Sequence, residues 1–337
     1  MLKKFIKKVA EKTDLTFDEM KEAMEIITTG QTTDAQIAGL LIGLKIKGET
    51  VEEITAAAMV MREKASRVEI DEDIILDTCG TGGDGFGTIN ISTAVSIVAA
   101  AAGVAVAKHG NRSVTSESGS ADVLKALGVN TEIPHEKIRK CVKDIHIGFF
   151  FAPAHHAAMK YAGGVRKELG VRTIFNLLGP IINPAGNKHH LMGVFSAALT
   201  EKIAGVLKNM GHTHSAVVCG EGNMDEITLA GRTKVSELKN GKINTYYIKP
   251  QDFGLKPAPM DAVRGGKPEK NAQIIRDVFS GMEKGPFRDV IVLNSGFALY
   301  IADKAKTPKA GIKLAAEIID TGAAEKKLKQ FVECSNS

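Results

Sequence analysis

The hydrophobic pattern changes near residue 74, and this change constrains the fold more than any other feature of the chain. After Ile74, short aliphatic runs alternate with amphipathic helical stretches. This alternation is typical of βαβ units, in which helices join parallel strands. We therefore predict an α/β fold whose central, mainly parallel sheet is flanked by helices. The predicted strands cover residues 74–76, 104–107, 148–151, 191–195 and 216–219.

Three later segments depart from this alternation. Residues 234–248 predict two strands joined at Asn240-Gly241, a dipeptide typical of tight hairpin turns. Residues 155–178 predict two or three helices in succession, which should break at Gly179-Pro180 and Asn183-Pro184. Two or three further helices are expected to close the chain.

Residues 1–66 precede the alternating region and predict four short helices. In three places a Thr stands three positions before a Glu or Gln, which is the pattern of a capping box at a helix start. The pairs are Thr16 with Glu19, Thr33 with Gln36, and Thr50 with Glu53. A module of this size has little core of its own, so we expect its apolar stripes to form a homodimer contact. The sequence does not divide the stripe of Met20, Met24 and Ile27 between core and interface.

The composition narrows the class of protein. A chain of 337 residues exceeds the size at which single cores usually stop growing, so two domains are expected. A net charge of +5 is modest and does not indicate a nucleic-acid partner. No run approaches the roughly 18 apolar residues of a membrane span, so no membrane partner is predicted. The four cysteines follow no disulfide or zinc spacing, which favours a reduced, cytoplasmic protein.

The segment from Asp77 to Leu127 carries the strongest chemical signal. A glycine cluster within residues 80–87 follows the first predicted strand and precedes the polar stretch 90–93 at a helix start. Glycine amides can approach an anion closely, and the helix N-terminus adds a favourable dipole. The second predicted strand then leads into the basic run 108–112. This order of elements favours a phosphate site.

The same loop matches the dinucleotide pattern G-x-G-x-x-G through Gly80, Gly82 and Gly85. A Rossmann unit should also carry Asp or Glu near the end of its second strand, to hold the ribose hydroxyls. Lys108 and Arg112 stand there instead. Positive charge favours a phosphate-rich ligand over NAD, and NADP remains open. The Walker pattern is absent, so a P-loop NTPase is not indicated.

Asp225 and Glu226 follow the strand predicted at 216–219 and a short glycine-containing loop. In open α/β sheets, ligands bind at the carboxyl ends of the strands. Adjacent carboxylates can share Mg²⁺, which takes few ligands from the protein. From the residues alone, a metal site and a solvated acidic turn are both open.

Four runs, in order, resemble the anthranilate phosphoribosyltransferase family of tryptophan biosynthesis. They are GTGGDGFGTINIST, KHGNRSVTSESGSADVLKALG, RKELGVRTIFNLLGPIINP and GEGNMDE. The resemblance implies a nucleoside phosphorylase/phosphoribosyltransferase-like fold with two domains. Residues 1–66 and an insertion at about 155–185 would form a small helical domain, through which family members are typically homodimers. Residues 70–154 and 186–337 would form the large α/β catalytic domain.

The resemblance also implies an activity and its residues. The family transfers the 5-phosphoribosyl group from PRPP to anthranilate, giving N-(5-phosphoribosyl)anthranilate and pyrophosphate, without a dedicated acid or base. Two Mg²⁺ ions are implied with PRPP bound, with Ser92, Asp225 and Glu226 as metal ligands. Gly80, Asn111 and Arg166 are implied for anthranilate. The residues implied for PRPP are Gly80, Gly83, Asp84, Thr88, Asn90, Ile91, Ser92, Thr93, Lys108, His109, Gly110, Asn111, Arg112, Ser113, Val114, Thr115, Ser116 and Ser120.

The chain departs from the family pattern next to the implied acceptor arginine. The His-Pro-Ala-Met segment reads His-Ala-Ala-Met at 156–159, and Val-x-Pro-Val-Arg reads Ala-Gly-Gly-Val-Arg at 162–166. Both changes remove a rigid proline. Three rival functions stay open: a pyrimidine nucleoside phosphorylase, whose Lys-x-Ser-Thr-Gly-Gly motif differs at 79–83; a nucleic-acid-binding relative without catalysis; and an NADP-dependent oxidoreductase.

Overall fold

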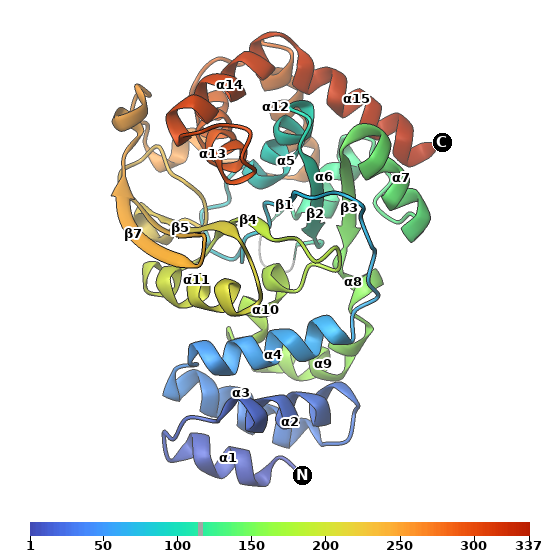
Figure 1. Ribbon diagram of the computed structural model, residues 1–337, viewed down its shortest axis with the longest axis vertical. Coiled ribbons are helices and arrows are strands. Elements are labelled where there is room, and N and C mark those ends of the chain that lie inside the picture. Colours follow the sequence, from blue (N-terminus) through green and yellow to red (C-terminus); the bar gives the residue numbers. More distant parts are fainter. Residues whose placement is uncertain (114–116) are drawn as a thin grey trace.

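The computed structural model describes residues 1–113 and 117–337 and contains a seven-stranded sheet with helices on both faces (Figure 1). The strand order is β3-β2-β1-β4-β5-β6-β7, in which β1 to β5 are parallel and the last two pairings are antiparallel. The predicted mainly parallel α/β fold is therefore confirmed. The strands are β1 (Ile75–Asp77), β2 (Ala105–Gly110), β3 (Ile147–Phe151), β4 (His189–Gly193), β5 (His214–Gly220), β6 (Thr233–Lys239) and β7 (Lys242–Ile248).

The strand order reverses at β1, and this reversal fixes where ligands can bind. The chain first adds β2 and β3 on one side of β1 and then places β4 and β5 on the other side. In open α/β sheets, ligands bind at the carboxyl ends of the strands beside such a reversal. Here the loop after β1 lies against the end of β4, where the Thr81 amide donates to the Gly193 carbonyl at 2.9 Å. The hairpin of β6 and β7 turns at Asn240 and Gly241, both with positive φ (50° and 76°), as the sequence predicted.

Helices cover both faces of the sheet (Figure 1). One face packs against α5 and the C-terminal helices, and the other against α11. The α-helices that follow β1 in the chain, including those of the insertion, are α5 (Ile91–Ala101), α6 (Ser120–Ala126), α7 (His135–Ile145), α8 (Ala152–His155), α9 (Lys160–Leu169), α10 (Phe175–Ile181), α11 (Thr200–Asn209), α12 (Pro268–Phe279), α13 (Pro286–Ile301), α14 (Pro308–Asp320) and α15 (Ala323–Asn336).

Two expectations about helices were wrong. Four helices close the chain rather than two or three. The break expected at Gly179-Pro180 does not occur, since α10 continues through Pro180 to Ile181, but the helix does end before the second expected break at Asn183-Pro184. Pro180 lies in the last turn of a short helix, where one missing backbone hydrogen bond costs little, and its neighbours Leu178 and Ile181 are buried.

The N-terminal residues form the four predicted helices, α1 (Lys3–Ala10), α2 (Phe17–Thr28), α3 (Asp34–Lys47) and α4 (Val51–Glu63). Complete capping boxes form at Thr16 and Thr50. At Thr33 only the threonine half forms. The Gln36 side chain accepts instead from the amide of Leu2 at 3.0 Å, because the start of α1 packs against α3.

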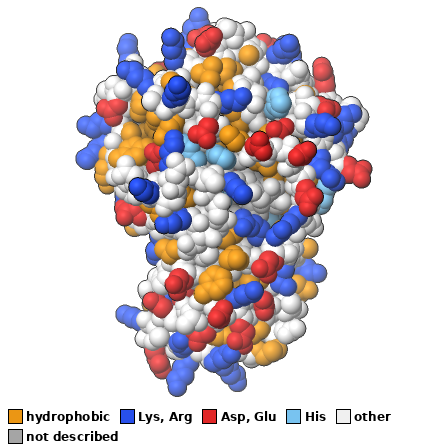
Figure 2. Space-filling view, viewed as in Figure 1, with side chains coloured by type: hydrophobic (Ala, Val, Ile, Leu, Met, Phe, Trp, Pro, Cys, Tyr) orange, Lys and Arg blue, Asp and Glu red, His pale blue; other side chains and the backbone are white. Residues whose placement is uncertain are grey.

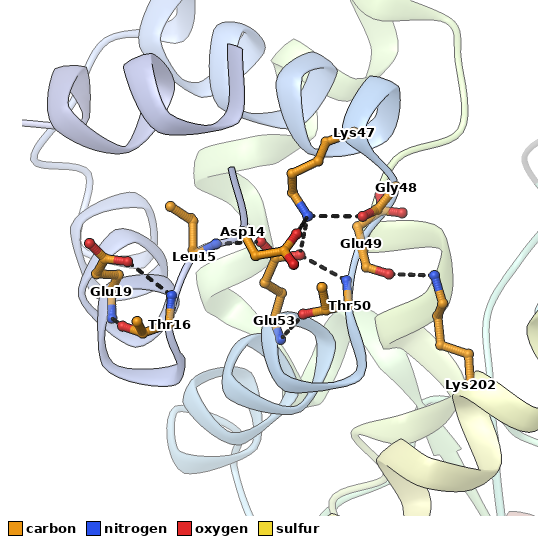
Figure 3. Close-up of polar contacts among 10 residues, drawn as sticks. All are labelled: Asp14, Leu15, Thr16, Glu19, Lys47, Gly48, Glu49, Thr50, Glu53 and Lys202. Carbon is orange, nitrogen blue, oxygen red and sulfur yellow. Dashed lines mark hydrogen bonds and ion pairs between the residues drawn. The ribbon is translucent and has the colours of Figure 1, made fainter. Parts of the chain in front are cut away.

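Glu53 joins three of these helices through one buried carboxylate (Figure 3). It accepts hydrogen bonds from the Leu15 amide (2.9 Å), the Thr50 amide (2.8 Å) and Lys47 Nζ (2.9 Å). The glutamate side chain is fully buried and the lysine side chain nearly so. Removing one partner of such a buried ion pair strongly destabilises the folded state, because the other charge is left buried and unpaired.

The helical module shares a core with the sheet. Helices α9 and α10 pack against the N-terminal helices, and the same apolar cluster continues through α11 to Met192 and Val217 on the strands. Met20, Met24 and Ile27 are at most 1% exposed within this single chain. This stripe therefore belongs to the core rather than to a dimer contact, because the insertion helices and α4 already cover it.

The distribution of charged side chains on the surface agrees with a modest net charge. On the face seen in Figure 2, acidic and basic side chains are interspersed over both the wide α/β part and the narrower helical part. Within the described part of the chain, no helix is both long and apolar enough to span a membrane.

Candidate active site

A buried carboxylate, Asp77, holds the ends of the first two strands together. Its Oδ1 accepts from the amides of Thr78 (2.7 Å), Cys79 (3.1 Å) and His109 (3.2 Å). Its Oδ2 accepts from Asn183 Nδ2 at 2.8 Å. The loops after β1 and β2 therefore start from one fixed point, which the sequence analysis did not identify.

The glycine loop after β1 lies against the loop after β5. The amide of Gly82 donates to Asp225 Oδ2 at 2.6 Å. A Cβ atom at Gly80 would lie 3.1 Å from both Asp225 Oδ2 and the Gly193 carbonyl oxygen, tighter than most such contacts. Gly80 is therefore required for close approach, and Gly82 and Gly83 for their positive φ of 63° and 74°.

The second carboxylate, Glu226, reaches the start of α5. Its Oε1 accepts from the Ser92 amide at 3.1 Å, and the Ser92 hydroxyl lies 3.4 Å from Lys108 Nζ. Lys108 is only 2% exposed. The structure thus brings together the three predicted metal ligands and places a buried cation beside them.

Burial makes ionisation of these two carboxylates unfavourable, and a bound cation would offset that cost. Burial, followed by the charge of nearby Asp84, raises the pKa of Asp225 to about 7. Burial and the charge of Asp225 raise the pKa of Glu226 well above its ordinary value, although Lys108 opposes this shift. Asp84 Oδ2 also accepts from the Asp225 amide at 3.3 Å.

The donor set fits Mg²⁺, a hard cation that prefers oxygen. Among the described residues, no three His, Cys, Asp or Glu side chains are arranged to surround a metal on their own. A cation here would therefore need further oxygen ligands from a phosphate or water, as Mg²⁺ usually does.

The start of α5 adds two polar side chains, those of Thr93 and Asn90. Thr93 Oγ1 is buried and, among the described residues, has no hydrogen-bond partner. Asn90 stands at the N-cap without capping the helix. A buried hydroxyl normally has a hydrogen-bond partner, so a bound ligand could supply the partner that Thr93 Oγ1 lacks among the described residues.

The basic run at the end of β2 lies beside the start of α6. A Cβ atom at Gly110 would clash with Ser120 Oγ, so the loop passes close to the start of α6. Asn111 and Arg112 are exposed, and Arg112 pairs with Glu132. Ser113 donates its amide to Asp122. Val114, Thr115 and Ser116 lie outside the described residues; Ile91 is buried at the start of α5, and Thr88 lies just before it.

Arg166 lies in α9, on the helical insertion between β3 and β4. Its guanidinium Cζ is 5.4 Å from the Phe175 ring centroid, and burial lowers its pKa. Among the described residues it makes no ion pair within 4 Å. An arginine held over an aromatic ring without a carboxylate is suited to bind an anionic ligand.

The histidines near the site are buried and lie against one another. His109 is 2% exposed and faces His156, with 3.3 Å between their Nε2 atoms. Burial, then the charge of nearby histidines, lowers the pKa of His109 well below its ordinary value. Burial likewise lowers the pKa of His156 to about 4. Burial raises the pKa of Cys79 to about 12, so this thiol is a filler rather than a nucleophile.

Arg172, between α9 and α10, was missed by sequence reasoning. It donates to the carbonyl of Gly83 and stacks on Phe195, with its Cζ 4.1 Å from the ring centroid. It ties the helical insertion to the glycine loop. Its place in the run RKELGVRTIFN was the only signal, and an exposed arginine gives no sequence cue for a backbone contact.

Comparison with known proteins identifies the family. Residues 72–325 match the a/b domain of the glycosyl transferase family, and residues 3–65 match its helical bundle domain. The chain is 51% identical over 337 residues to the anthranilate phosphoribosyltransferase of Acetivibrio thermocellus, covering 100% of this chain and 97% of that protein. It is 50% identical to that of Petrotoga mobilis, with the same coverage. The chain belongs to the anthranilate phosphoribosyltransferase family.

Solved structures of anthranilate phosphoribosyltransferases share the whole fold. The Thermus thermophilus enzyme superposes with a TM-score of 0.94 at 42% identity, over 98% of this chain and 99% of that chain. The Saccharomyces cerevisiae enzyme, in a complex with PRPP and Mg, has a TM-score of 0.91 at 27% identity, over 99% and 98% of the two chains. The resemblance in the four sequence runs is thus confirmed over the full length.

Proposed function

We infer that this chain transfers the 5-phosphoribosyl group from PRPP to the amine of anthranilate and releases pyrophosphate, a step of tryptophan biosynthesis. The observation that carries this inference is the meeting of Asp225, Glu226 and Ser92 with the glycine loop at the switch point of the sheet. Family membership at about half identity supports the substrates. The yeast relative has been solved with PRPP and Mg and with 4-fluoroanthranilate.

The phosphoribosyl donor, PRPP, is assigned to the glycine loop and the polar groups around α5. The amides of this loop, the hydroxyl of Thr93 and the side-chain amide of Asn90 would hold phosphate oxygens, and Lys108 supplies positive charge. Asp225, Glu226 and Ser92 would hold Mg²⁺, which neutralises charge on the departing pyrophosphate. Two ions are part of this proposal, and the remaining ligands would come from PRPP and water.

The acceptor substrate, anthranilate, is assigned to the residues around Arg166. Arg166 would bind the anthranilate carboxylate bidentately, with Asn111 and Gly80 completing the contact. The aniline nitrogen is neutral near pH 7, so its lone pair is available without a base. Alignment of this nitrogen with the donor carbon supplies much of the acceleration, since effective molarities of oriented groups reach about 10⁵ M.

The domain arrangement belongs to the same proposal. Residues 1–66 with the insertion at about 155–185 form the helical domain, and residues 70–154 and 186–337 the catalytic domain. We also propose a homodimer through the helical domain. Ile46 and Val171, 70% and 45% exposed, are apolar candidates for its interface. A cytoplasmic location stays a prediction from the sequence.

The test is loss of anthranilate fluorescence on mixing with PRPP and Mg²⁺, with the product identified by mass. We expect N-(5-phosphoribosyl)anthranilate and one pyrophosphate for each anthranilate consumed. Phosphorolysis of a pyrimidine nucleoside, or NADPH oxidation with no anthranilate turnover, would contradict the proposal and support a rival function.

A further inference from the structure

Residues 263–271, far from the glycine loop in the chain, pack against the end of that loop. The Gly265 amide donates to the Gly87 carbonyl at 2.8 Å, and the Ile89 amide donates to the Val263 carbonyl at 3.1 Å. A Cβ atom at Gly265 would lie 2.9 Å from the Ile89 nitrogen, so no larger residue fits without a shift. This segment therefore braces the chain directly before α5.

Asn271, in the first turns of α12, extends this brace to a side chain of the site. It is 1% exposed. Its Oδ1 accepts from the Gly266 amide at 2.8 Å, and its Nδ2 donates to Asn90 Oδ1 at 2.9 Å. Since both polar atoms are paired at good distances, the direction of the Asn271 amide is fixed.

Ser118 holds Asn90 from a second side. The Ser118 hydroxyl donates to Asn90 Oδ1 at 3.0 Å, and Asn90 Nδ2 donates to the Ser118 carbonyl at 3.0 Å. An asparagine side chain has two acceptor sites and two N–H donors. Both acceptor sites and one donor are thus used. Among the described residues, the second N–H of Asn90 has no partner.

We propose that Asn271 is a positioning residue for the donor substrate, which fixes the amide of Asn90 so that its free N–H faces a phosphate oxygen of PRPP. Without the Asn271 donor, the Asn90 amide can turn and present its oxygen to the phosphate, and two acceptors repel each other. Asn271 itself touches no substrate. This inference rests on the proposed function, which assigns Asn90 to PRPP.

The first test is Asn271→Asp, which keeps the shape and the acceptor for Gly266 but places an oxygen opposite Asn90 Oδ1. We expect KM for PRPP to rise about tenfold, the effect of one lost hydrogen bond, with KM for anthranilate changed less than about twofold. Asn187→Asp is the matched control. Asn187 is 4% exposed and donates to the His189 carbonyl at 3.0 Å, at the opposite ends of the strands. This control should lower the thermal midpoint without changing KM for PRPP.

The second test separates positioning from support of the fold by a double-mutant cycle with Asn90→Ala. If Asn271 acts through Asn90, Asn271→Asp adds no further rise in KM for PRPP once Asn90 is absent. Independent, additive rises would overturn the inference. Should Asn271→Asp fail to fold, Asn271→Ser supplies the same cycle.

The two proposals fail in distinguishable ways. A wild type that does not consume anthranilate contradicts the proposed function. An active wild type whose KM for PRPP is unchanged by Asn271→Asp overturns the role of Asn271 alone.

Discussion

The Asp225 carboxylate accepts a hydrogen bond of 2.6 Å from the amide of Gly82, 143 residues earlier in the chain. This bond joins the loop after β5 to the loop after β1, on the two sides of the point where the strand order reverses. The carboxylate proposed to hold a metal and the loop proposed to hold a diphosphate are therefore built as one unit. Changes on either side should affect donor binding.

Gly83→Ala tests the phosphate assignment of the glycine loop. Gly83 has φ of 74°, so alanine there carries strain of about 1–3 kcal/mol and adds a methyl group to the loop. We expect PRPP affinity to fall about tenfold to a hundredfold by calorimetric titration, with anthranilate affected less. Gly241→Ala, at φ of 76° in the distant hairpin, should destabilise without this loss. Tight NADPH binding to the wild type would overturn the assignment.

Arg166→Ala should raise KM for anthranilate more than tenfold while KM for PRPP changes little. The lost contact is a charge-assisted bond to the acceptor carboxylate, worth about 1.5–3 kcal/mol. Lys167→Ala, on the next residue of α9, is the control and should leave both constants near the wild-type values. Equal rises in the two constants for Arg166→Ala would show that the arginine only supports the fold.

Buried histidines should make the fold sensitive to acid. Burial lowers the pKa of His156 from 6.5 to about 4, so the unfolded chain binds a proton that the folded chain rejects between these values. The stabilisation is complete above pH 6.5 and is lost as pH falls toward 4, by up to about 3 kcal/mol. Urea unfolding at pH 7.5 and 5.0 should show this loss, and His156→Gln should reduce it. An equal fall in the free energy of unfolding between pH 7.5 and 5.0 in the wild type and in His156→Gln would contradict this role of His156.

The proposed dimer can be tested by sedimentation at micromolar concentration. We expect the wild type to sediment as a dimer and Ile46→Glu to shift it toward monomer, because a charge at this exposed apolar position would have to be buried in the interface. Met282→Glu, at a residue 72% exposed on the α/β part, is the control and should stay dimeric. A compact wild-type monomer would refute the proposal.

The parts of the fold that local sequence determines could be predicted. The caps at Thr16 and Thr50, the turn at Asn240 and the alternating strands all depend on residues close in the chain. Gln36 was misassigned because a distant amide, that of Leu2, competes for its side chain. Met20 could not be divided between core and interface for the same reason, since the helices that cover it come from elsewhere in the chain.

The candidate site likewise contains some residues that the sequence predicts and others that it does not. Asp225 and Glu226 could be predicted, because they follow a strand and match a family motif. Asp77, Arg172 and Asn271 could not, since each acts through backbone or side-chain contacts to distant loops. An isolated Asp, Arg or Asn carries no local sign of such a contact.

The Mg²⁺ dependence of the rate in the double variant Asp225→Asn with Glu226→Gln tests the central claim most directly. The account predicts that turnover of anthranilate falls at least about a hundredfold, and that added Mg²⁺ no longer raises the rate, because the protein ligands for the cation are gone. Glu221→Gln is the control on the same loop, where the carboxylate accepts from the Arg232 amide, and it should keep the wild-type titration. A double variant that folds and shows an unchanged Mg²⁺ titration would contradict the account.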